Sequence, residues 1–148
     1  MDLILWRHAE AEDGLADLSR ELTDKGRKQA EKTAAFLHRH LPEHARILVS
    51  PAVRTQQTAA AFTSHFTTAP AIAPGASAHA VLQAVRWPGA GDAVLVVGHQ
   101  PTLGAVAAQL LGCEFSSLRI KKGGLWWFNY RESSSEITLR LVITPEFL

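Results

Sequence analysis

The chain has 148 residues, a length typical of one compact domain, so we expect a single domain over residues 1–148. Hydrophobic residues make up 47% and charged residues 20%, with a formal net charge of +1, which argues against disorder and against a broad nucleic-acid-binding surface. No apolar run approaches the roughly 18 residues of a membrane span, so we expect no membrane association. Cys113 is the only cysteine, which excludes an internal disulfide and favours a reducing compartment, the cytoplasm.

The first predicted elements are a strand and a helix. Residues 3–6 form a short apolar run that ends at Arg7, a pattern typical of a strand buried on both faces. Thr23 is the expected N-cap of a helix over about 24–40, in which small and apolar residues recur on one face. Pro42 ends that helix, because proline cannot continue it.

A second buried strand is predicted over residues 46–49. Ser50 follows it as the expected N-cap of another helix. Pro51 would then occupy the first helical position, where its missing N–H does no harm. This interpretation puts Arg54 in the first turn of the helix.

The middle of the chain combines loop signals with a strong strand. Prolines and glycine in 67–77 indicate a loop with at most one short strand, followed by a helix at about 78–85. The run 93–97 is the clearest strand pattern in the sequence. A turn at 98–101 then leads into a helix rich in alanine and leucine that ends near Gly112.

The C-terminal segments 124–130 and 137–143 flank a polar turn and predict a hairpin. Strands and helices alternate up to that point. We therefore predict the α/β class: a three-layer α/β/α sandwich with a mostly parallel central sheet and an antiparallel C-terminal edge hairpin.

Charged side chains follow three of the predicted strands. In open α/β sheets ligands bind beyond the carboxyl ends of the strands, which here carry Arg7-His8, the segment 50–54 and His99. Guanidinium groups and a helix N-terminus suit phosphate oxygens. A neutral imidazole among them can attack phosphorus and form a phosphohistidine. Two imidazoles beside two arginines make a poor metal site, so we expect neither a metal nor another cofactor.

Four segments in register resemble the histidine phosphatase superfamily, the phosphoglycerate mutase-like group. They are residues 5–11 (LWRHAEA), 22–26 (LTDKG), 50–59 (SPAVRTQQTA) and 97–101 (VGHQP). Each match is modest by itself, and the specificity comes from their order and spacing.

The resemblance implies roles for individual residues. His8 would be the nucleophile, while Arg7, Arg54 and His99 would hold the phosphoryl group and stabilise its transition state. From its position alone, Ser50 is expected to be a helix cap first and a phosphate contact second. The short chain is similar to the compact SixA-type branch, which implies a partner bearing phosphohistidine, such as a bacterial phosphotransfer domain.

The chain departs from the family pattern at two places. Ala9 stands where the family usually has glycine, which matters only if this residue needs a positive φ. Residues 70–90 contain no Asp or Glu, although larger relatives carry an acidic proton donor there. Glu10 and His79 are the candidates for a proton relay. A missing acid would impair attack on alkyl phosphates more than on phosphohistidine, whose imidazole leaves readily.

Two alternatives to a phosphohistidine phosphatase remain open from the sequence. One is a phosphomonoesterase or mutase of the same fold that acts on a small phosphorylated molecule. The other is a phospho-binding regulatory protein without catalysis, which Ala9 and the missing acid would suit.

Overall fold

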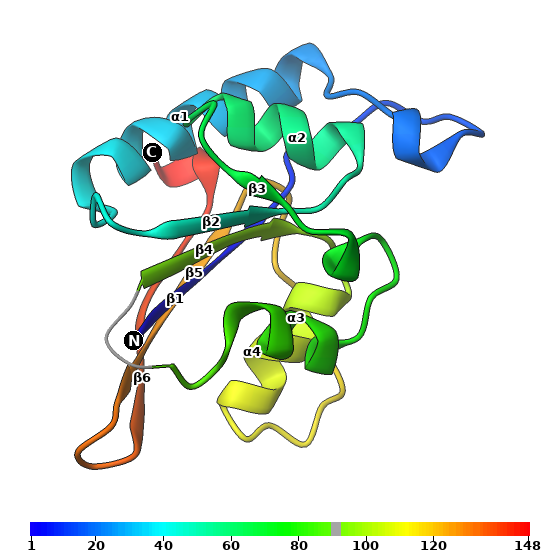
Figure 1. Ribbon diagram of the computed structural model, residues 1–148. Helices are drawn as coiled ribbons and strands as arrows, with labels where there is room; N and C mark the ends of the chain where they lie inside the picture. Colours follow the sequence, from blue (N-terminus) through cyan, green and yellow to red (C-terminus); the bar gives the residue numbers. More distant parts are fainter. Residues whose placement is uncertain (90–92) are drawn as a thin grey trace.

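The computed structural model describes residues 1–89 and 93–148, and six strands form one sheet in the order β3-β2-β4-β1-β5-β6 (Figure 1). Two 3-10 turns, η1 (Asp17–Ser19) and η2 (Pro70–Ile72), lie in connections, and a third, η3 (Pro145–Phe147), follows the last strand. The strands are β1 (Asp2–Arg7), β2 (Arg46–Val49), β3 (Thr67–Thr68), β4 (Ala93–Gly98), β5 (Leu125–Arg131) and β6 (Glu136–Ile143). The helices are α1 (Asp24–His40), α2 (Val53–Ala60), α3 (Ala78–Val85) and α4 (Thr102–Leu110).

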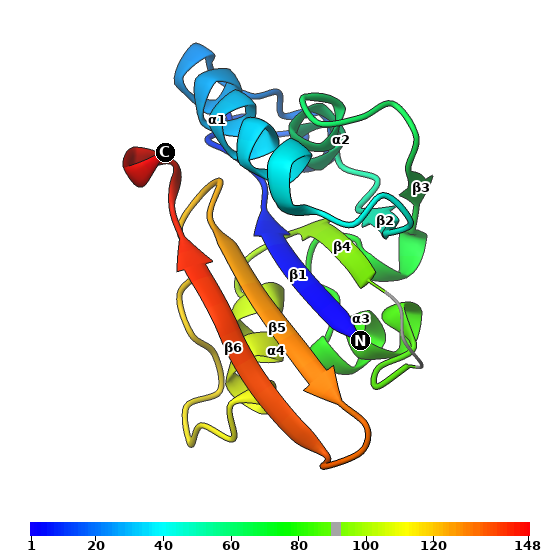
Figure 2. The same ribbon diagram turned by 90° about the vertical axis from the view of Figure 1, so that its left-hand side faces the viewer.

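The helices cover the sheet from both sides. Helices α1 and α2 lie on one face and α3 and α4 on the other, as two perpendicular views show (Figures 1 and 2). Strands β1 to β4 pair in parallel, whereas β5 and β6 join as an antiparallel hairpin at the edge. The predicted three-layer α/β/α architecture is therefore confirmed.

Two hydrophobic clusters, one on each side of the sheet, hold the layers together. Alternate residues of β1 belong to the two clusters. Leu3 and Leu5 pack toward α3 and α4, and Ile4 and Trp6 pack toward α1. All four are fully buried. The apolar run at 3–6 is continuous because this strand, inside the sheet, must bury both faces.

The strand register brings the polar strand ends together. Arg7 pairs with Gly98 across β1 and β4, and Val49 pairs with Val97 across β2 and β4. Since parallel strands end at the same edge, the residues that follow them meet there. The adjacent strands β2, β4 and β1 thus bring together residues that lie about 50 and 90 positions apart in the sequence.

Most predicted element boundaries agree with the structure, but the start of α2 does not. The N-cap is Ala52 and the helix begins at Val53, so the prediction of Ser50 as N-cap and Pro51 as first helical residue was wrong. The Ser50 hydroxyl instead lies 2.6 Å from Nε2 of His99. The backbone carbonyl of Ser50 accepts hydrogen bonds from the side chains of Thr55 and Gln56. The later start still leaves Arg54 in the first turn.

No helix in the part of the chain that the structure describes is both long and apolar enough to cross a membrane.

Gly26 in α1 packs against the backbone that follows the first strand. A Cβ atom at this position would collide with the carbonyl oxygen of Glu10, which is backbone and cannot rotate away. We expect Gly26→Ala to lower the free energy of unfolding by about 2 kcal/mol, because overpacking outweighs the gain in helix propensity. Urea unfolding measures this. Gly14→Ala is the control, since its Cβ would meet only the Cγ of Arg20 at 3.5 Å; equal stability of the two variants would contradict the expected collision.

Candidate active site

His8 lies at the point where β1 leaves the sheet. Its N–H donates to the carbonyl of Gly98 at 3.0 Å, which continues the parallel pairing one residue beyond the strand. On the other side, the N–H of Gly123 donates to the carbonyls of Arg7 and His8, both at 3.1 Å. The histidine is 7% exposed. Its backbone is therefore fixed from both neighbouring segments.

The hydrogen bonding of His8 selects one tautomer. Its Nδ1 lies 2.7 Å from the carbonyl oxygen of Ala9, which can only accept, so Nδ1 carries the proton. Burial, together with the charges of Arg54 and Arg7, lowers the pKa of His8 to about 4, although the Ala9 hydrogen bond acts to raise it. The imidazole is then neutral at neutral pH. Its Nε2 keeps a lone pair.

His99 lies beside His8, with 5.4 Å between the ring centroids and the planes tilted by 54°. Its Nε2 is 2.6 Å from Oγ of Ser50. Burial lowers the pKa of His99 to about 3, with further contributions from His8 and Arg54. The structure thus brings together His8, His99 and Ser50 from three strand ends.

Arg54 is 4% exposed and is held by the loop that precedes α1. Its Nη1 donates to the carbonyl of Asp17 at 2.7 Å, and its Nη2 lies 3.2 Å from the Asp17 carboxylate. Hydrogen bonds from Arg20 and Arg54 hold the pKa of Asp17 below its ordinary value. Asp17 is accordingly an anion at neutral pH.

Arg7 is half-buried and its Nη1 donates to the carbonyl of Ile120 at 2.8 Å. Burial lowers the pKa of Arg7, and the positive charge of Arg119 adds to the effect. Within residues 1–89 and 93–148, Nε of Arg7, Nε of Arg54 and Nδ1 of His99 are buried without a hydrogen-bond partner. Buried polar nitrogens are rarely left unpaired, so their concentration here fits a site for oxygen-rich anions.

Helix α2 braces the segment after His8. Oγ1 of Thr58 accepts from the N–H of Ala9 at 3.1 Å and donates to the carbonyl of Arg54 at 2.7 Å. Ala9 is fully buried and does not have a positive φ; among the described non-glycine residues only Arg86 and Ser135 do. Its methyl group is therefore accommodated without backbone strain, which removes one objection to an intact site.

The two candidates for a proton relay have other surroundings in the described structure. The Glu10 carboxylate accepts a hydrogen bond from the hydroxyl of Thr23 at 2.8 Å. His79 is exposed in the first turn of α3, across the sheet from α1. No hydrogen bond joins either side chain to His8 or His99 in the described structure.

Among the described residues, no group of three or more His, Cys, Asp or Glu side chains could hold a metal ion. The guanidinium groups of Arg7 and Arg54 would also repel a cation near the two imidazoles.

Sequence reasoning missed Asp17, Thr58 and the carbonyl of Ile120. Thr58 could have been found, because it follows Arg54 by one helical turn and so shares its face. Asp17 lies in a loop without periodicity, and a backbone carbonyl leaves no signal in side-chain identity.

His8 is expected to stay neutral, protonated on Nδ1, as the pH falls. Because its pKa is about 4 in the folded chain and 6.5 ordinarily, the folded state binds fewer protons between these values. The free energy of unfolding should decrease as the pH falls from 6.5, with the loss complete below about 4. NMR of the imidazole nitrogens measures the protonation directly. A His8 titration midpoint at the ordinary value would contradict the effect of burial.

The chain is similar to known proteins in sequence and in fold. Residues 3–76 match the histidine phosphatase superfamily, branch 1. The phosphohistidine phosphatase SixA homolog of Haemophilus influenzae is 36% identical over 129 residues, 76% of this chain and 78% of that protein. The structure of the protein histidine phosphatase SixA complexed with tungstate has a TM-score of 0.81 at 26% identity over 99% of both chains. A phosphoserine phosphatase from Entamoeba histolytica, in complex with phosphoserine, shares the fold at 17% identity, with a TM-score of 0.76 over 99% of this chain and 98% of that one. Sequence, fold and the paired arginines and histidines at the strand ends agree, and the chain belongs to the histidine phosphatase superfamily.

Proposed function

We propose that this phosphatase removes phosphoryl groups from phosphohistidine in proteins, through a covalent phosphohistidine on His8 and without a metal. The observation that carries the proposal is the state of His8. Its Nδ1–H is fixed by the Ala9 carbonyl, and the low pKa leaves Nε2 unprotonated in the positive field of Arg54 and Arg7. A neutral nucleophile beside two cations is suited to attack on a phosphoryl dianion.

In the first step the lone pair of His8 Nε2 forms a bond to phosphorus. The phosphorus–nitrogen bond of the substrate breaks, and its imidazole nitrogen takes the electron pair and gains a proton. Arg7 and Arg54 neutralise charge on the phosphoryl oxygens, and the buried Nδ1 of His99 is available to a further oxygen.

In the second step a water oxygen attacks phosphorus and the bond to His8 Nε2 breaks. His8 regains its lone pair. Over the whole cycle one proton of the water leaves on the substrate imidazole and the other on hydrogen phosphate. The enzyme is returned unchanged.

The substrate class follows from the chemistry of the leaving group. The only carboxylate bonded to the site arginines in the described structure is that of Asp17, which is ionised and cannot donate a proton at neutral pH. Neither Glu10 nor His79 is hydrogen-bonded to His8 in the described structure. An imidazole leaves without strong acid assistance, whereas an alkoxide does not. This favours phosphohistidine over alkyl phosphates.

The alternative function is a phosphomonoesterase for small molecules. The similarity to phosphoserine phosphatase supports this alternative only at the level of the fold. Turnover of free phosphohistidine, a phosphohistidine protein, phosphoserine and phosphoglycerate, each with and without EDTA, separates the two. We expect the phosphohistidine substrates to react with the higher kcat/KM and EDTA to leave the rate unchanged. Preference for the alkyl esters would overturn the substrate assignment, and loss of activity in EDTA would overturn the metal-free mechanism. The cytoplasmic location that the single Cys113 suggests stays a prediction.

A further inference from the structure

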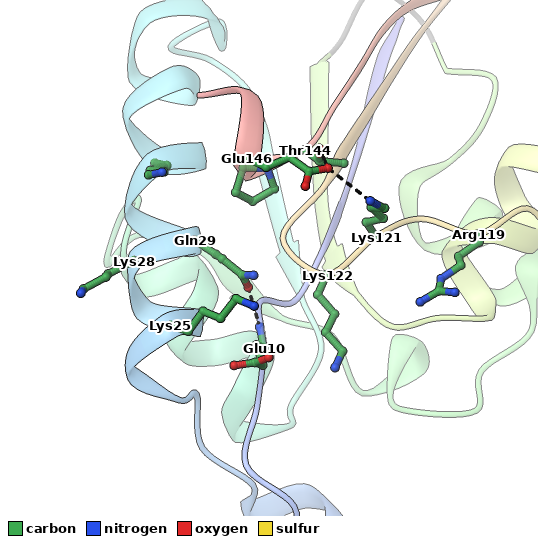
Figure 3. Close-up of a pocket in the computed structure, with 11 residues that line it drawn as sticks. Glu10, Lys25, Lys28, Gln29, Arg119, Lys121, Lys122, Thr144 and Glu146 are labelled. Atoms are coloured by element: carbon green, nitrogen blue, oxygen red, sulfur yellow. Dashed lines mark hydrogen bonds and ion pairs between the residues drawn. The ribbon is translucent and has the colours of Figure 1, made fainter.

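A basic cleft of about 510 Å³ is lined by Glu10, two residues after His8, and by residues of two further segments and α1 (Figure 3). Its walls are the N-terminal half of α1, the segment 119–122 before β5, and the turn Thr144–Glu146 at the C-terminus. Six basic residues line it, against two acidic ones, Glu10 and Glu146. The basic residues are Lys25, Lys28, Lys32, Arg119, Lys121 and Lys122.

Most of this positive charge is not neutralised within the chain. Lys121 forms an ion pair with Glu146 at 3.2 Å, which lowers the pKa of that carboxyl. The other five basic residues have no ion pair with any residue of the described structure. Lys25 and Lys122 reach into the space between α1 and the 119–122 segment, whereas Lys28 points away from it (Figure 3). The cleft is therefore an exposed cationic surface.

The walls of the cleft are bonded to the catalytic segment. Glu10 follows His8 by two residues, and its N–H donates to Gln29 of α1 at 2.9 Å. The carbonyl of Ile120 accepts from Arg7, and Gly123 donates to the carbonyls of Arg7 and His8. The cleft is thus anchored to the same backbone segments that hold Arg7 and His8.

A net charge of only +1 shows that the cationic surface is local. Basic residues spread along two chain segments, α1 and 119–122, match a chain of separated negative charges better than one small anion. A nucleic acid is disfavoured, because the formal net charge of the chain is only +1.

We infer that this cleft docks a Glu- or Asp-rich segment of the protein whose phosphohistidine enters the active site. The inference rests on the proposed function for its substrate and adds the chemistry by which the partner is recognised. Charge complementarity speeds encounter and lowers KM, while the chemical step at His8 is left unchanged.

Two synthetic peptides with a central phosphohistidine test the docking, one flanked by glutamates and the other by glutamines. We expect the wild type to prefer the glutamate peptide at least tenfold in kcat/KM at low salt, and the preference to shrink as salt screens the charges. The variant Lys25→Glu/Lys122→Glu should lose the preference through KM and keep its turnover of free phosphohistidine. Arg39→Glu/Arg131→Glu is the matched control, because it changes the net charge equally at exposed positions outside the cleft.

An equal preference in the cleft variant and the control would overturn the docking site, as would the absence of any preference in the wild type. Failure of the wild type to turn over free phosphohistidine would instead overturn the proposed function. Fluorescence anisotropy with the unphosphorylated glutamate peptide then still decides the docking, since it needs no catalysis. Stronger binding of a single-stranded oligonucleotide than of the glutamate peptide would replace the acidic protein partner by a nucleic acid.

Discussion

Replacing His8 with alanine is expected to lower kcat on phosphohistidine by at least about 10⁴-fold, the scale on which enzymes lose turnover without their nucleophile. No other imidazole in the described structure has the same combination of a fixed Nδ1–H and a lone pair beside two guanidinium groups. His99 cannot replace His8 as the nucleophile, because its Nε2 is hydrogen-bonded to the hydroxyl of Ser50. Phosphate release under saturating substrate measures the effect.

Because His8 is buried, a variant that preserves its hydrogen bond separates catalysis from folding. In His8→Asn the side-chain amide can still donate to the Ala9 carbonyl, so thermal unfolding should stay close to wild type while turnover is lost. His44→Ala at an exposed position should keep full activity. Turnover above about one hundredth of wild type in His8→Asn would show that His8 is not the nucleophile.

Arg54→Ala is expected to lower turnover by at least about a hundredfold, as when one electrostatic partner of the transition state is lost. The guanidinium is buried in the first turn of α2, where the helix dipole also favours an anion. Arg54→Lys should recover part of the rate, since it keeps the charge but loses the planar fork.

The control for Arg54 is Arg39→Ala, an exposed arginine at the other end of the same layer. Its kcat/KM should equal that of the wild type. A nearly unchanged rate in Arg54→Ala would remove this arginine from the site and leave Arg7 as the phosphoryl ligand.

Sequence patterns could predict the scaffold because its elements follow simple periodicities. The apolar runs at 3–6 and 93–97 are continuous because both strands are buried on two faces, and Thr23 caps α1 as expected, accepting from Gly26 at 2.9 Å. The placement of the candidate site residues followed from this scaffold, since Arg7, His8 and His99 lie at the ends of adjacent parallel strands.

What the sequence could not predict depends on tertiary contacts. Serine is a residue type favoured at helix N-caps, but the hydroxyl of Ser50 contacts His99, which follows another strand. Helix α2 therefore starts two residues beyond Pro51. The pairing of Asp17 with Arg54 joins residues 37 apart across a loop without a repeating pattern. The basic cleft likewise needs three distant segments to meet.

In the proposed mechanism His8 carries the phosphoryl group between substrate and water. Brief reaction with labelled phosphohistidine, followed by an alkaline quench and peptide mass spectrometry, tests it most directly. We predict an acid-labile, base-stable phosphate on His8, absent from His8→Asn. A phosphate on another residue, or none while the substrate is turned over, would contradict the account.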